Sequence, residues 1–101
     1  MNLHNTDPWS VEIAMAGRDG SILYAEHSGN IHFYCEFGGG DVLAIIHGLD
    51  QVAWEKQYPW AMQRRMQILQ RVAQDVIRQK APACIADVDE RSGHILLREP
   101  K

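Results

Sequence analysis

The sequence predicts an α+β domain: an antiparallel β-meander of four or five strands, one long amphipathic helix and a C-terminal β-hairpin. Three observations predict it. Apolar residues alternate with a period of two in the first half, short glycine-containing segments separate those runs, and residues 60–80 contain neither Gly nor Pro. A chain of 101 residues has room for one core. Residues 10–101 form the predicted domain, and residues 1–9, mostly polar with Pro8 near their end, form a flexible N-terminal arm.

The first half contains the four strands of the meander. The runs are 11–17, 21–26, 31–37 and 41–47, separated by Gly17–Gly20, Ser28–Asn30 and Gly38–Asp41. Within 31–37, the odd-numbered residues are apolar and face the core, whereas His32, Tyr34 and Glu36 face outward. In the first turn, the Asp19–Gly20 pair is expected to supply the positive φ of a tight hairpin. Because all the connections are short, neighbouring strands should pair antiparallel.

The second half contains the helix and the hairpin. Residues 52–55 (Val-Ala-Trp-Glu) fit either a short fifth strand or an extended edge segment. Pro59 suits the first turn of a helix over residues 60–80, and the Ala81–Pro82 pair ends that helix. Segments 83–88 and 94–98 then flank an Asp89–Gly93 loop as two strands. One sheet face should pack against the helix, which leaves the other face to solvent or to a partner.

The helix has one apolar side and one glutamine-lined side. Leu69 and Val76 lie on the apolar side and are expected to pack with Phe33 and Phe37, whereas Gln63, Gln67, Gln70 and Gln74 lie opposite. Arg65 is the exception, because its helical position falls inside the apolar side. Its guanidinium should either extend to solvent or pair with a strand carboxylate, from Glu26, Glu36 or Asp87.

Composition excludes several classes of protein. With 46% hydrophobic and 23% charged residues, the chain is globular in composition. No apolar run is long enough to cross a bilayer, no export signal is visible, and two cysteines do not make a disulfide scaffold. A cytoplasmic protein is expected. A net charge of −3 argues against binding to nucleic acid.

No catalytic residue, metal site or cofactor is predicted. There are five histidines, but only His32 and Glu36 are expected to share a face, and zinc needs three or four converging ligands. The Gly38–Gly40 run lacks the lysine and the following helix of a phosphate-binding loop. Cys35 lies on the apolar side of its strand, which suits a buried hydrophobe better than a nucleophile.

The charges and aromatic residues indicate a surface that binds protein. Residues 1–50 contain one base and seven acids, whereas residues 51–101 contain nine bases and six acids. Tyrosine and tryptophan are typical of interface hot spots, and an acidic surface attracts a basic partner. The expected function is a non-enzymatic protein-binding module with a basic partner. The candidate binding residues are Glu26, His32, Tyr34, Glu36 and Trp54.

The layout also resembles a known class of proteins. The segment Ile31–Glu36, Trp54, the Pro59–Trp60 pair and the segment Arg65–Val72 resemble small bacterial immunity proteins that neutralise polymorphic toxins. Those proteins combine a short meander, a tryptophan-bearing connection and an amphipathic helix. The resemblance covers about half of the chain and rests on the spacing of core residues. It implies a stoichiometric inhibitor of a toxin, without catalytic residues.

Two other classes of function remain open. A small ligand-binding or enzymatic domain would use His32, Tyr34 and Glu36 on the open sheet face, and a concave pocket there would favour it. A structural subunit would form a homodimer through an exposed sheet face or edge, and its solution mass would reveal it.

Overall fold

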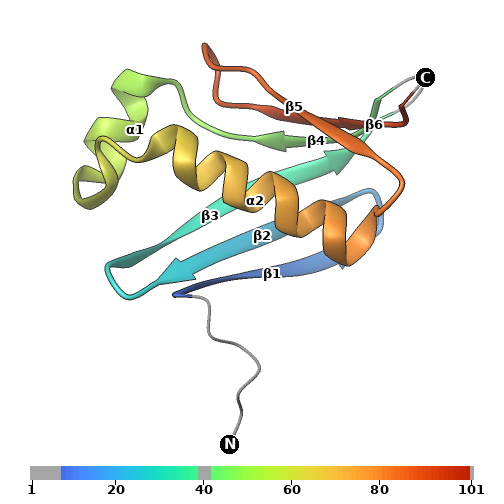
Figure 1. Cartoon of the computed structure of the whole chain (residues 1–101), viewed down its shortest axis with the longest axis horizontal. Helices are drawn as coiled ribbons and strands as arrows, with labels where there is room; N and C mark the ends of the chain where they lie inside the picture. Colours follow the sequence, from blue (N-terminus) through green and yellow to red (C-terminus); the bar gives the residue numbers. More distant parts are fainter. Residues whose placement is uncertain (1–7, 39–41, 101) are drawn as a thin grey trace, which may run out of the picture.

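The computed structural model describes residues 8–38 and 42–100, and it contains one six-stranded antiparallel sheet and one long helix (Figure 1). The strand order is β1-β2-β3-β4-β6-β5. The elements are β1 (Trp9–Ala16), β2 (Asp19–Glu26), β3 (Gly29–Phe37), β4 (Val42–His47), α1 (Gln51–Gln57), a 3-10 turn (Pro59–Ala61), α2 (Arg65–Lys80), β5 (Ile85–Val88) and β6 (Ile95–Arg98). The predicted α+β class, with a meander, a long helix and a C-terminal hairpin, is confirmed. Most of the predicted arm lies outside the described residues, but Trp9 already belongs to β1.

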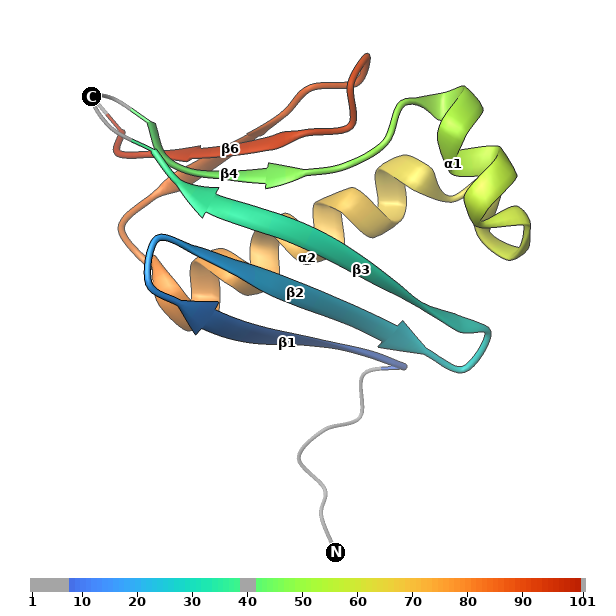
Figure 2. The same ribbon diagram turned by 180° about the vertical axis from the view of Figure 1, so that it is seen from behind.

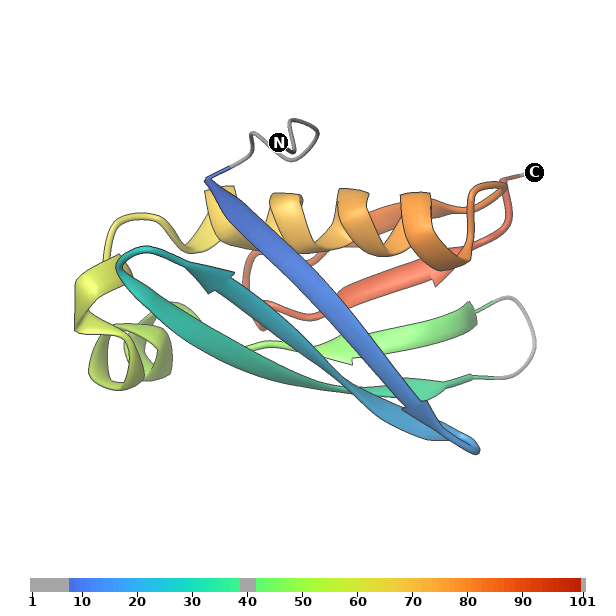
Figure 3. The same cartoon turned by 90° about the horizontal axis from the view of Figure 1, so that it is seen from below.

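The sheet and α2 form two layers. Helix α2 lies across one face of the sheet, and the view from behind shows the opposite face without a helix on it (Figure 2). Seen from below, the sheet is strongly twisted and α2 runs along one side of it (Figure 3). We call the uncovered side the open face. It carries, among others, Leu23 on β2; His32, Tyr34 and Glu36 on β3; Ile45 and His47 on β4; and Leu96 on β6.

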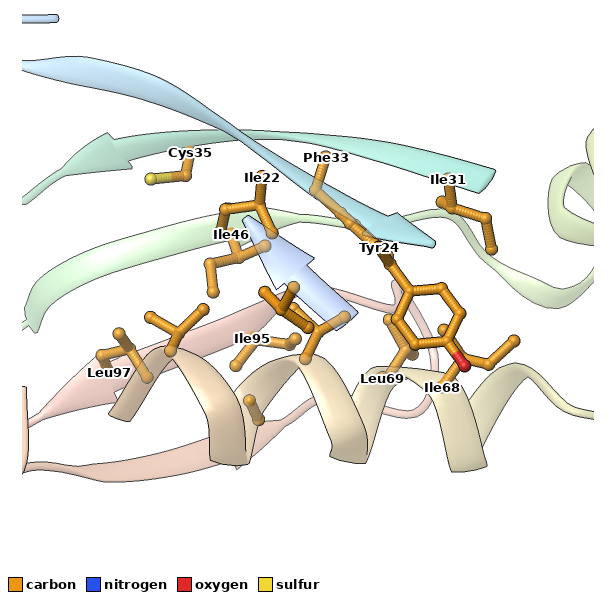
Figure 4. Packing of buried hydrophobic residues seen from close by; sticks show 14 of the residues in the cluster. Ile22, Tyr24, Ile31, Phe33, Cys35, Ile46, Ile68, Leu69, Ile95 and Leu97 are labelled. Atoms are coloured by element: carbon orange, nitrogen blue, oxygen red, sulfur yellow. The ribbon is translucent and has the colours of Figure 1, made fainter. Parts of the chain in front are cut away.

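The core lies between the sheet and α2. Alternate residues of the central strands, such as Ile22, Phe33 and Ile46, point toward Leu69 on the helix (Figure 4). Leu69 and Val76 are buried as predicted, and so is Phe33. Phe37 was expected among them, but this residue is 46% exposed. It stands at the end of β3, next to the end of α2, where less of the sheet is covered.

The first turn differs from the prediction. Ala16 pairs with Asp19, so the turn consists of Gly17 and Arg18. Gly17 has φ +70°, whereas Gly20 is a strand residue of β2. The glycine therefore stands at the first central position of a two-residue hairpin, where a positive φ matches the twist of the strands.

The fifth strand predicted at residues 52–55 is wrong, because the segment belongs to helix α1. The Asp50 side chain accepts a hydrogen bond of 2.9 Å from the backbone N–H of Ala53, which is a helix N-cap. Trp54 is fully buried, and its indole N–H donates to the carbonyl of Ala61 at 2.8 Å. Burial of this large side chain fixes the short helix against the core.

The long helix also begins later than predicted. Pro59 starts a 3-10 turn that ends at Ala61, and α2 begins only at Arg65. Met62, which falls within the predicted helix range, instead precedes α2 and is exposed. The predicted end at Lys80 is confirmed.

Arg65 takes neither of its two expected environments. Its residue is only 7% exposed, so it does not extend to solvent. It donates to Gln51 Oε1 at 2.9 Å, to the Leu49 carbonyl at 3.0 Å and to the Glu90 carbonyl, and no described carboxylate forms an ion pair with it. Neutral oxygens from the first residue of α1 and from two loops therefore hold the buried cation, and Arg65 joins the start of α2 to these segments.

We expect Leu69→Ala to lower the free energy of unfolding by about 2–5 kcal/mol, because it removes a fully buried side chain from the centre of the core. Gln70→Ala, at an exposed position of the same helix, should change it by less than about 0.5 kcal/mol. Urea unfolding measures both values. Equal losses for the two variants would contradict the assignment of the core.

Arg65→Met should lower the free energy of unfolding by at least about 2 kcal/mol, because it leaves buried acceptors without a donor. Since no carboxylate pairs with Arg65, the loss should be the same at pH 3 and pH 7. Urea unfolding at the two pH values tests this. A loss that is present at pH 7 and absent at pH 3 would reveal a carboxylate partner.

Candidate functional site

The structure brings together three of the five predicted binding residues. His32, Tyr34 and Glu36 lie on the open face of β3, as the alternation predicted. Tyr34 is 50% exposed and stands opposite Ser21 on β2 and His47 on β4. These side chains share one continuous surface, because β3 lies between β2 and β4 near the middle of the sheet.

Hydrogen bonds hold this surface in one arrangement. The Tyr34 hydroxyl donates to Asp19 Oδ2 at 3.1 Å, and His47 Nε2 donates to Glu36 Oε1 at 2.7 Å. The rings of Tyr34 and His47 lie 5.4 Å apart between centroids. The hydroxyl bond to the Asp19 carboxylate raises the pKa of Tyr34, because it stabilises the neutral phenol. Tyr34 is thus an exposed ring with a fixed position.

A second histidine, His94, lies next to His47 and continues the row of polar side chains that Tyr34, Glu36 and His47 form on the open face. His94 lies with its ring centroid 5.0 Å from that of His47, and its Nδ1 accepts a hydrogen bond of 3.1 Å from the backbone N–H of Gly48. A neutral His94 therefore carries its proton on Nε2. Sequence reasoning did not select Asp19, His47 or His94 as binding residues. The strand register could have found His47, since it faces the same side as Tyr34 once β4 is paired with β3.

Aliphatic side chains surround this polar row. Leu23 stands opposite His32, and Ile45 stands opposite both Glu36 and Leu96. All three aliphatic residues are half-buried by their neighbours, although no element within the described ranges covers them. The open face therefore combines apolar area with a few oriented polar groups, which is the usual make-up of a binding interface.

The His47–Glu36 pair is also the kind of arrangement that orients a general base. A nucleophile is needed to complete it, and in the described part of the chain no hydroxyl or thiol donates to either histidine side chain. Cys35 points to the other side of the sheet, where burial raises the pKa of its thiol. Among the described residues, no group of three or more His, Cys, Asp or Glu side chains is arranged to hold a metal ion.

Glu26, one of the candidate binding residues, does not belong to this surface, because its side chain is almost fully buried. Its side chain is 9% exposed and accepts two hydrogen bonds from Arg64, at 2.9 and 2.7 Å. The Tyr24 hydroxyl donates to the same carboxylate at 2.6 Å, and the Arg71 guanidinium lies 3.7 Å away. The bidentate bond from Arg64 is the main reason why the pKa of Glu26 falls to about 2. Glu26 ties β2 to α2.

Trp54 is also absent from the surface, because it is part of the core. Its ring is fully buried and packs edge-on against Tyr58, with 5.1 Å between the ring centroids. A partner could not reach Trp54 while α1 is folded. The helix N-cap at Asp50 is the sequence signal that would have placed Trp54 on a helix facing inward.

Comparisons with known proteins found no relatives. No protein-family model matches the chain, and searches of curated proteins and of solved structures found no match. No helix in the described ranges is long and apolar enough to span a membrane.

Glu26→Gln should lower the free energy of unfolding at pH 7 by about 1–3 kcal/mol, because the folded protein holds the Glu26 pKa near 2, well below its usual 4.5. The stabilisation by a depressed carboxylate is complete above the unfolded pKa and is lost as the pH falls from about 4.5 toward 2. Urea unfolding between pH 2 and 7 should therefore show a weaker pH dependence for the variant.

Arg64→Met should reproduce this weaker dependence, because it removes the main cause of the low pKa. Gln67→Ala is the control, since it removes another hydrogen-bond partner of Arg64 and leaves Glu26 paired. A Glu26→Gln profile parallel to that of the original protein would contradict the assigned role of Glu26.

Proposed function

We propose that the protein is a non-enzymatic binding module that recognises a basic protein through the open face of its sheet. One observation carries the proposal: an exposed tyrosine, Tyr34, is held in place on an uncovered sheet face, with Asp19 and Glu36 beside it. Oriented tyrosines are frequent among the residues that dominate interface affinity. The aliphatic side chains around Tyr34 supply apolar area that a partner would bury.

Charge is the basis for expecting a basic partner. Glu12, Asp19 and Glu36 lie on the open side of β1, β2 and β3. Arg98 on β6 is neutralised by an ion pair of 2.7 Å with Asp87. The acidic character of residues 1–50 therefore remains on this face, although Glu26 is neutralised elsewhere. An acidic surface increases the rate of association with a basic protein.

The resemblance to immunity proteins gives the proposal a more specific form. In that form the partner is a toxin, and the module blocks it stoichiometrically. The form requires a contact surface and no catalytic group, which is compatible with an open face that carries aromatic, aliphatic and acidic side chains.

Photo-crosslinking in cells that express the protein tests whether the open face binds the partner. A photoreactive amino acid at position 32, on the open face, should capture a basic protein, and the same group at position 70, on the outer side of α2, should not. Capture from position 70 alone, an acidic product, or no product from position 32 would contradict the proposal.

Association kinetics with the captured protein then test the contributions of Glu36 and Tyr34 to binding. Glu36→Lys should lower the association rate at low salt and lose this effect at high salt, because mobile ions screen exposed charges. Tyr34→Ala should mainly raise the dissociation rate, by about tenfold or more. Glu90→Lys, in the β5–β6 loop, makes the same charge change away from the open face. If Glu90→Lys slows association as much as Glu36→Lys does, the assigned surface is wrong.

A further inference from the structure

A cavity of about 370 Å³ lies beneath the other face of the sheet, between the C-terminal end of α2 and the nearby ends of the strands. Eleven of its twelve lining residues are apolar, and the twelfth is Lys80. Cys35 and Leu97 mark its position at the end of the core toward the last turns of α2 (Figure 4). None of His32, Tyr34 and Glu36 lines it, so it is separate from the open face.

The cavity lies where the twisted sheet diverges from the last turns of α2 (Figure 3). Helix α2 stops at Lys80, and the side chains that meet beneath its last turn, such as Val76, Ala44 and Cys35, are too small to fill the space. Three larger side chains, Met15, Phe37 and Leu43, stand at the rim. They are three of the seven large apolar side chains that the described residues leave exposed. Their concentration at one opening is the mark of a binding site.

The size and the walls of the cavity fit an apolar ligand. Small-molecule sites occupy about 300–1,000 Å³ and are lined mainly by apolar groups. Ordered water would need about two to four polar partners, and these walls offer almost none. An engineered apolar cavity of roughly 150 Å³ stays dry and takes up benzene.

Lys80 gives the cavity one polar end. Its ammonium is the single charged group of the lining, and no described carboxylate forms an ion pair with it. The other titratable group in the walls is the Cys35 thiol, which burial keeps neutral. An apolar cavity with a cation at its rim is complementary to a molecule with an apolar chain and an anionic head.

We propose that this cavity binds a single-chain aliphatic carboxylate, with the chain beneath the end of α2 and the carboxylate at Lys80. The chain would cover Phe37 and Met15, and its head group would stay at the solvent boundary. This ligand site does not depend on the protein-binding role of the open face, because the two surfaces lie on opposite sides of the sheet.

The first test is a chain-length series with the unmodified protein. Calorimetric titration with hexanoate, octanoate, decanoate and dodecanoate, each below its micelle-forming concentration, should show an affinity that rises roughly fourfold per methylene until the cavity is full. Absence of binding across the series, or an affinity independent of chain length, would overturn the proposal.

Variants locate the ligand. Cys35→Phe fills the cavity and should reduce decanoate binding at least tenfold. Lys80→Met should weaken decanoate about two- to fivefold and leave decanol unchanged, because only the carboxylate uses the ammonium. Lys56→Met, on α1, is the matched control and should change neither. A folded Cys35→Phe protein with unchanged affinity would overturn the proposal, and the chain-length series decides the question if that variant does not fold.

The remaining alternative occupant is a second copy of the chain, inserting its own Phe37. Analytical ultracentrifugation at the protein concentration of the titration distinguishes a monomer that binds the carboxylate from a dimer that fills the cavity itself. A monomer that binds decanoate supports the proposal. A dimer that does not bind decanoate and dissociates on Phe37→Ser would overturn it.

Discussion

The architecture depends on a single constraint: one helix must cover a six-stranded sheet. Helix α2 buries the inward side chains of the central strands, and nothing in the described structure covers their outward side chains. Because the sheet twists, the ends of β1 and β3 diverge from the last turns of α2 (Figure 3), and Met15 and Phe37 are exposed there. The open face and the apolar cavity are therefore two consequences of the same shortage of cover.

Besides its packing in the core, three arginines near the start of α2 tie the helix to its surroundings. Arg64 and Arg71 bind the Glu26 carboxylate and Tyr24 on β2, while Arg65 donates to two loops. Positive side chains at a helix N-terminus oppose the helix dipole, and the buried Glu26 carboxylate offsets them. Close approach of the two loops also requires glycine: Gly93 has φ +83°, and a Cβ there would lie 2.1 Å from the Leu49 carbonyl oxygen.

Local patterns predicted the elements, whereas long-range contacts decided the roles of single residues. The alternation of β3 correctly placed His32, Tyr34 and Glu36 on one face, and the Gly- and Pro-free stretch correctly located the long helix. The burial of Glu26 and Trp54 could not be predicted from such local patterns. Glu26 is buried because α2 brings Arg64 to it from 38 residues away, and Trp54 because α1 folds over Ala61. Phe37 lies on the predicted side of β3, but it is exposed there. The alternation predicts which face of the sheet a residue lies on, and it does not predict which part of that face a helix covers.

The most direct test of one-sided cover is the accessibility of neighbouring methyl groups to a soluble paramagnetic probe in the free protein, measured by NMR. Ile45 and Ile46 are adjacent on β4, and Leu96 and Ile95 are adjacent on β6, with one member of each pair on either side of the sheet. The account predicts strong relaxation of the Ile45 and Leu96 methyl groups and weak relaxation of the Ile46 and Ile95 methyl groups. Equal protection of both members of each pair would mean that the open face is covered, and would contradict the account.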